Sequence, residues 1–232
     1  MDRKHDLLPW NLATYEDSDL VQAVPELNAL QKVIEQNDWH NDDAFQQSLR
    51  LFHWVQELPA SLLEVISLPE ITLQAVLASV ADPTNSHHTA KTLLGFAALI
   101  HDVGKTKTFQ HLPDGTTRCP GHETVSARMT PTICARFDFT LAETRFMTNL
   151  VGAHGEPYAL FKKIAALPAP EQQEQIRCFE TQHADHLLPL LILASGDMLT
   201  SHLKAIQPEK YKAVFDFYQR WLQRIWAGKS KK

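Results

Sequence analysis

Apolar residues recur at helical spacing through most of this 232-residue chain. In residues 24–36 and 43–58 they return every three or four positions, which places them on one face of an amphipathic helix. Residues 211–226 carry a similar stripe that includes several aromatic side chains, and we interpret it as core packing. No segment of any length alternates apolar and polar residues with the period of two that a half-buried strand requires. The pattern predicts an all-α fold.

Further helices are indicated by their ends. Residues 61–81 are expected to form one or two helices. Asn85 or Ser86 is expected to cap the helix that follows them, since both side chains can accept a hydrogen bond from a free backbone amide. Thr140 and Glu143 have the spacing of a capping box, which predicts that another helix begins there.

The composition agrees with a single helical domain. Hydrophobic residues make up 44% of the chain, enough to bury one sizeable core. The 8 Gly and 13 Pro are scattered, and no linker, low-complexity tract or internal repeat separates one part from another. We therefore expect residues 1–232 to form a single-domain helical bundle.

Charge and cysteine usage narrow the possible partners. A net charge of −5 argues against a broad nucleic-acid surface. Cys119, Cys134 and Cys178 have no CxxC spacing, which is typical of a reducing compartment. The N-terminus lacks the apolar region of a signal peptide, and the longest apolar run, residues 187–194, is too short to span a bilayer. The expected location is the cytoplasm, with no membrane partner.

One apolar helix ends in polar, ionisable residues that do not suit a hydrophobic core. In "LLGFAALIHDVGKTKTF", residues 93–109, the apolar run stops at His101 and Asp102, and Gly104 permits a tight exit. An imidazole and a carboxylate are costly to bury unless they are paired or hold a metal, and both are good ligands for a transition metal. Lys105 is placed to act as a point charge for a phosphate, or it is a solvated lysine near a helix end.

Three more polar residues lie at helix ends or inside an apolar helix. His122 is expected at the start of a helix, His154 at the end of another that Gly155 stops, and Asp197 within the apolar helix 184–203. Each has an ordinary alternative, respectively a surface residue, a C-capping histidine and a buried ion pair. Taken together with the His-Asp pair, they favour a metal centre.

The order of these motifs resembles the HD superfamily of metal-dependent phosphohydrolases. More narrowly, "AALIHDVGK" is similar to the HD domain appended to bacterial tRNA nucleotidyltransferases and poly(A) polymerases, as are Pro25-Glu26-Leu27 and Trp39-His40 upstream. The resemblance spans about residues 24–203, and helix 211–226 is expected to pack on that core. About two dozen residues precede the match, so the nucleotidyltransferase half is absent and a free-standing HD domain is expected.

The resemblance implies a site with one or two divalent transition metals, namely Mn, Fe, Ni, Co or Zn. One metal would have His101, Asp102 and Asp197 as ligands, with Gln47 as a weak ligand where the family has a histidine. The second would have Asp102, His122 and His154. Asp102 and Lys105 would be the catalytic residues, and Glu123 would either orient His122 or simply sit as an acid in the first turn of its helix.

Gln47 is a departure from the family pattern, because an amide oxygen is a poorer ligand than an imidazole. His40 and His53 are expected about 10 Å from Gln47 along the same helix, at 1.5 Å per residue. His87 and His88 lie about 20 Å back along the helix that ends in His101, by the same rise. On this basis no other histidine takes the place of Gln47.

The expected activity is hydrolysis of a phosphomonoester or phosphodiester, with a nucleotide as the favoured small phosphorylated substrate. Metal ions at such a site polarise a phosphoryl oxygen and lower the pKa of a water molecule. The alternative is a degenerate, non-catalytic HD domain that binds a nucleotide, RNA or a protein partner. Gln47 supports this alternative, and the presence of the remaining motif residues supports the enzyme.

Overall fold

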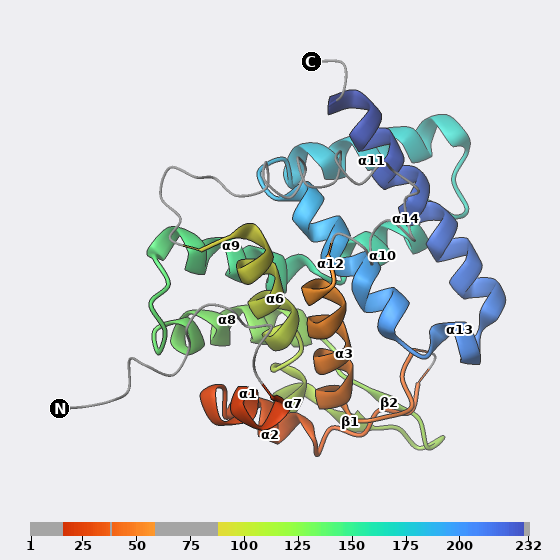
Figure 1. Cartoon of the computed structure of the whole chain (residues 1–232). Coiled ribbons are helices and arrows are strands. Elements are labelled where there is room, and N and C mark those ends of the chain that lie inside the picture. The colour runs from red at the N-terminus through yellow and green to blue at the C-terminus, as the bar shows by residue number, and fades with distance from the viewer. Residues whose placement is uncertain (1–15, 38, 59–87, 230–232) are drawn as a thin grey trace.

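The computed structural model describes residues 16–37, 39–58 and 88–229, which are predominantly helical, as predicted (Figure 1). The helices are α1 (Asp17–Ala23), α2 (Glu26–Leu30), α3 (Ala44–Gln56), α6 (Ala90–Ile100), α7 (Lys105–Thr108), α8 (His122–Cys134) and α9 (Leu141–Ala153). They continue with α10 (Glu156–Ile164), α11 (Ala169–Gln182), α12 (Leu187–Thr200), α13 (Leu203–Ile206) and α14 (Pro208–Lys229). A small hairpin of β1 (Gln110–His111) and β2 (Thr117–Arg118) joins α7 to α8.

Two almost wholly apolar helices, α6 and α12, form the centre of the core. Helix α6 packs on α3 and α9, and α12 packs on α3, α9 and α14 (Figure 1). The predictions for residues 43–58, 184–203 and 211–226 are confirmed by α3, α12 and α14. Polar residues on α6 and α12 are consequently drawn to the middle of the molecule.

The capping predictions have different outcomes. Thr140 and Glu143 form the predicted capping box at the start of α9. Thr89 caps α6, because its hydroxyl accepts a hydrogen bond from the amide of Thr92. The predictions for residues 61–81, and for Asn85 and Ser86 as caps, fall outside the described residues.

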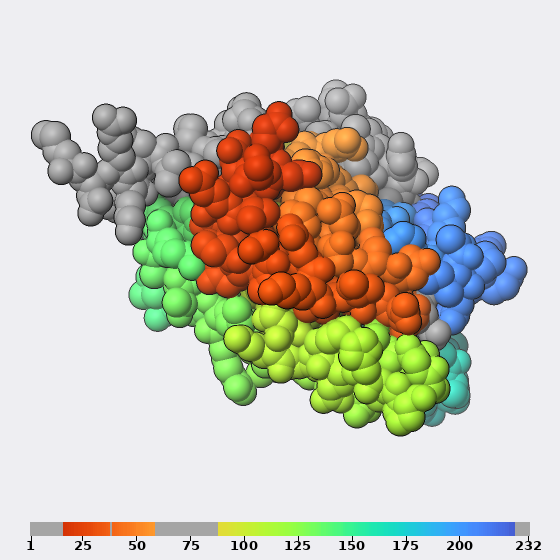
Figure 2. Space-filling model, turned by 90° about the horizontal axis from the view of Figure 1, so that it is seen from below, coloured from red at the N-terminus to blue at the C-terminus, as the bar shows by residue number. Residues whose placement is uncertain are grey.

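The helix predicted over residues 24–36 is wrong beyond its first turns. Helix α2 ends at Leu30, and the chain then becomes extended so that Ile34 bridges to Asp43. Gln36 exchanges hydrogen bonds with Thr117 of the hairpin, donating to its hydroxyl at 2.7 Å and accepting from its amide at 2.9 Å. Figure 2 shows residues 31–37 and 39–43 lying against the hairpin, so tertiary pairing overrides local helical periodicity here.

The expected position of His40 is also wrong. Helix α3 begins at Ala44, with Asp43 as its N-cap, so the helical rise does not separate His40 from Gln47. The side-chain oxygen of Asn37 accepts a hydrogen bond from the His40 amide at 3.0 Å and turns the chain back on itself. His40 is thereby buried.

Two glycines allow the close helix contacts that build the site. A Cβ atom on Gly196 would lie 2.6 Å from Trp54 and 2.7 Å from Leu51, so α12 approaches α3 more closely than a side chain would permit. A Cβ atom on Gly104 would lie 2.4 Å from the His122 carbonyl oxygen. The φ of Gly104 is an ordinary −66°, so glycine is needed there for close approach to α8 rather than for the tight exit expected from the sequence.

Candidate metal centre

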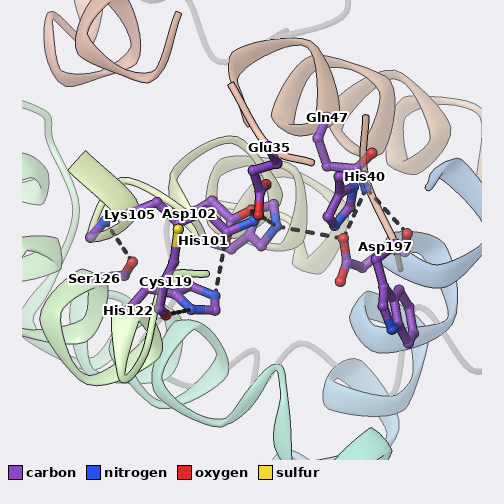
Figure 3. A network of polar contacts seen from close by, with 12 residues as sticks. Glu35, His40, Gln47, His101, Asp102, Lys105, Cys119, His122, Ser126 and Asp197 are labelled. Carbon is purple, nitrogen blue, oxygen red and sulfur yellow. Dashed lines mark hydrogen bonds and ion pairs between the residues drawn. The ribbon is translucent and has the colours of Figure 1, made fainter. Parts of the chain in front are cut away.

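The predicted ligand residues come from four helices and meet around Asp102. His101 caps the C-terminus of α6, and Asp102 follows it. His122 is the first residue of α8, His154 caps the C-terminus of α9, and Asp197 lies in α12. Figure 3 shows the Asp102 carboxylate between the imidazole of His122 and the group formed by His101 and Asp197. The structure therefore brings all five predicted residues into one site.

Asp102 divides this site into two halves. Its Oδ1 atom lies 3.0 Å from Nε2 of His122 and 3.8 Å from Nε2 of His154, and we call this group the Oδ1 half. Its Oδ2 atom lies 3.1 Å from Nε2 of His101. That same nitrogen is 3.7 Å from Oδ1 of Asp197, and we call Asp102 Oδ2, His101 and Asp197 the Oδ2 half. A carboxylate with different partners on its two oxygens can bridge two cations.

All three imidazoles are oriented in the same way by their own backbone. The Nδ1 atoms of His101, His122 and His154 lie 2.7, 2.9 and 2.7 Å from the carbonyl oxygens of Ala98, Cys119 and Val151, respectively. A carbonyl oxygen only accepts, so each Nδ1 carries the hydrogen and each neutral ring presents a lone pair at Nε2. This orientation is the one that metal-bound histidines take.

The Nε2 atoms converge in a way that suits a cation. Those of His122 and His154 are 3.3 Å apart, although in neutral rings both would present lone pairs. Nε2 of His101 is buried and faces two carboxylates, at 3.1 Å from Oδ2 of Asp102 and 3.7 Å from Oδ1 of Asp197. His101, Asp102 and His154 also offer ligand atoms that all lie within 4.8 Å of one another. These residues fit a divalent transition metal, for which mixed imidazole and carboxylate ligation is suitable.

Burial and nearby charges shift the pKa values of these groups in opposite directions. Burial would raise the pKa of Asp102, but the positive charges of His101 and Lys105 hold it well below its usual range. Burial opposes a charge on His101, yet the carboxylates of Asp102 and Asp197 raise its pKa to about 10. Burial and the charges of His101 and His122 lower the pKa of His154 to about 4. Without a metal, the Oδ2 half thus holds a proton while His154 remains a neutral donor.

Lys105 is not the solvated lysine of the sequence-based alternative, because it is only 4% exposed. Its Nζ lies 2.9 Å from Oδ2 of Asp102 and 2.6 Å from Oε2 of Glu35. Burial opposes its charge, but the two carboxylates outweigh that effect and raise its pKa. Sequence reasoning missed Glu35, which falls in the stretch that was expected to continue as helix and gives no signal of its own.

Gln47 lies beside Asp197, as the resemblance implied, but its side-chain nitrogen, not its oxygen, faces that carboxylate. Its Nε2 donates to Oδ1 of Asp197 at 2.9 Å, and its Oε1 accepts from Arg50 at 2.8 Å. Arg50 can only donate and a carboxylate can only accept, so the chemistry of both partners fixes this orientation. The oxygen of Gln47 is therefore turned toward Arg50.

Glu123 combines the two roles considered for it. It lies in the first turn of α8, where an acid suits the helix dipole. Its Oε2 atom is also 3.4 Å from Nδ1 of His122. The Cys119 carbonyl is closer to that nitrogen, at 2.9 Å, and therefore sets the tautomer of His122. Glu123 is a second, more distant acceptor that supports the same ring orientation.

A cavity of about 740 Å³ opens over the site. Asp102, His122, His154 and Asp197 line its inner wall. The rest of the wall holds cationic and aromatic side chains, including Arg118, Lys162, Lys210, Trp39 and Tyr158. The rings of Trp39 and Tyr158 meet edge to face with centroids 4.6 Å apart, and Nζ of Lys162 lies 4.9 Å from the Tyr158 centroid. The cavity thus joins a cluster of metal-ligand types to a surface suited to anions and flat rings.

Comparisons with known proteins relate part of this chain to an enzyme. No protein-family model matches the chain. It is 35% identical over 109 residues to the A-adding tRNA nucleotidyltransferase of Deinococcus radiodurans. Within the described ranges, no helix has both the length and the hydropathy to cross a bilayer. The similarity covers 47% of this chain and 23% of that enzyme, so it establishes a partial relationship to it.

Proposed function

We propose that this chain is a single-domain, metal-dependent phosphohydrolase of the HD superfamily. The observation that carries the proposal is the convergence of three imidazole Nε2 atoms and a second carboxylate on Asp102, next to a cavity of about 740 Å³. The partial relationship to a tRNA nucleotidyltransferase supports an enzyme that handles a nucleotide or RNA. The substrate is a phosphomonoester or a phosphodiester.

The two halves of the site would hold one metal each. His122 and His154 would bind the metal of the Oδ1 half, and His101 and Asp197 that of the Oδ2 half, with Asp102 shared between them. When bound, such metals polarise a phosphoryl oxygen and make hydroxide available near neutral pH. Mixed imidazole and carboxylate ligation suits Mn, Fe, Ni, Co or Zn.

The outer wall of the cavity supports a nucleotide as substrate. Arg118 and Lys162 bring positive charge to the cavity, which favours a phosphate group. Trp39 and Tyr158 offer apolar ring surface on which a base can stack. Lys105, which lines the inner wall, would hold Asp102 in place and offset negative charge that develops on the phosphate.

The test is to change Asp102, the residue that both halves share. We expect Asp102→Ala to abolish Mn²⁺ binding, measured by elemental analysis, and hydrolysis of p-nitrophenyl phosphate, bis(p-nitrophenyl) phosphate and a panel of nucleotides. Asp138→Ala, at an exposed position, is the matched control and should leave both unchanged. Hydrolysis that survives Asp102→Ala at its original rate would refute the mechanism.

Two observations favour a second candidate, a non-catalytic HD domain that binds nucleotide, RNA or a protein partner. The ammonium of Lys105 already neutralises Oδ2 of Asp102 in the metal-free protein, and Gln47 stands where the family has a histidine. Calorimetric titration of nucleotides into metal-free protein distinguishes the candidates. Tight binding without metal, combined with no turnover after Mn²⁺ loading, would favour the binding domain.

A further inference from the structure

The Oδ2 half lacks one donor that the Oδ1 half has. Two imidazoles flank Oδ1 of Asp102, whereas His101 is the one imidazole at hydrogen-bonding range of Oδ2 among the described residues. Gln47 does not supply the missing donor, because its oxygen accepts from Arg50 and its nitrogen donates to Asp197. A metal there would have three protein ligands at most from the residues named so far.

His40 lies next to this gap. It lines the cavity and is only 6% exposed, and its buried Nδ1 atom has no hydrogen-bond partner in the part of the chain that the structure describes. Figure 3 shows its imidazole between Gln47 and the carboxylate of Asp197. A buried polar atom without a partner is costly unless something binds it.

The backbone around His40 holds it in this position. Its amide donates to the side chain of Asn37 at 3.0 Å, and its carbonyl accepts from the Asn37 amide at 3.0 Å. Two residues later, the backbone carbonyl of Asp42 accepts a hydrogen bond from the Glu35 amide at 2.8 Å. The Asp42 carboxylate accepts one from the Arg50 guanidinium at 2.6 Å. The turn is therefore closed by its own hydrogen bonds and is anchored to α3.

We propose that His40 is a metal ligand of the Oδ2 half, where it takes the place of the histidine that Gln47 replaces. The assignment rests on the proposed metal centre. Gln47 then has a different role, because its hydrogen bond to Asp197 aims that carboxylate at the same point. An imidazole from the turn before α3 thus takes the ligand role that an imidazole within α3 would otherwise have.

Metal binding by the full-length chain tests this assignment. After Mn²⁺ loading we expect two equivalents in the wild type and one in His40→Ala, with affinity at the Oδ2 half weakened by at least about tenfold. His53→Ala is the matched control, since His53 is an exposed histidine of α3 that pairs with Asp17. It should retain both equivalents. Circular dichroism and thermal unfolding show whether each variant is folded, and His40→Gln provides a variant of closer size.

A measurement on the wild type requires no variant. Loaded with Co²⁺, each coordinated histidine gives a hyperfine-shifted proton signal from the ring N–H that does not bind the metal. We expect four such signals, from His40, His101, His122 and His154, and three would overturn the assignment. If the wild type binds metal and His40→Ala binds the same amount equally tightly, the role of His40 is refuted while the proposed function stands. If the wild type binds no metal, both are refuted.

Discussion

The two halves of the site differ in how much positive charge their own residues supply. The Oδ1 half has two imidazoles beside one carboxylate oxygen: burial opposes a charge on both rings, but Asp102 raises the pKa of His122 while the pKa of His154 falls. The Oδ2 half already contains the ammonium of Lys105 and a protonated His101. The difference indicates that the residues of the Oδ2 half supply more buried positive charge than those of the Oδ1 half.

The largest effect that tests this difference is expected from Lys105→Met. The change leaves the buried carboxylates of Glu35 and Asp102 without their shared cation, which should lower the free energy of unfolding by about 3–5 kcal/mol. Urea denaturation of the metal-free protein measures it, with Lys107→Met, at an exposed position on the same helix, as control. Equal stability of the two variants would show that the Oδ2 half does not depend on its internal charge.

A smaller effect is expected from Gly104→Ala, which acts on the Oδ1 half. The new Cβ would meet the His122 carbonyl oxygen at 2.4 Å and the Ser126 amide nitrogen at 2.5 Å, both of which are backbone atoms of α8. We expect a destabilisation of about 1–3 kcal/mol from overpacking, together with weaker metal binding by His122.

Gly152→Ala is the control for that variant, because its Cβ would contact one side-chain atom, of Ala127, at 3.3 Å. Thermal unfolding and Mn²⁺ titration give the two readouts. If Gly104→Ala weakens the Oδ2 half while leaving the Oδ1 half intact, the two halves are not positioned by separate helix contacts.

The smallest effect is expected from Gln47→His. It adds an imidazole beside Asp197 and removes the hydrogen bond that Arg50 now donates to Gln47. We expect the affinity of the Oδ2 half for Mn²⁺ to rise by on the order of tenfold, as measured by titration. Gln46→His, an exposed neighbour on α3, should have no effect. Unchanged affinity in Gln47→His would argue that position 47 does not face the metal.

Much of the site could be predicted because its residues interrupt strong patterns. Asp197 stands out in an apolar helix, and His101, His122 and His154 stand at helix ends that glycine and capping signals mark. The sequence gives no comparable signal for Glu35, and it places His40 about 10 Å from Gln47 on an assumed helix. Glu35 lies where helical periodicity continues in the sequence, while Thr117, more than eighty residues away, pairs with Gln36 and draws the chain into extended form. Long-range pairing of this kind leaves no local trace.

The backbone contacts of the three histidines bear on how such a site can change over evolution. Each ring takes its tautomer from a carbonyl three residues earlier in its own segment, rather than from a neighbouring ligand. Orientation is thus an independent property of each helix end. In a chain built this way, a substitution at one ligand position would leave the orientation of the other imidazoles unchanged.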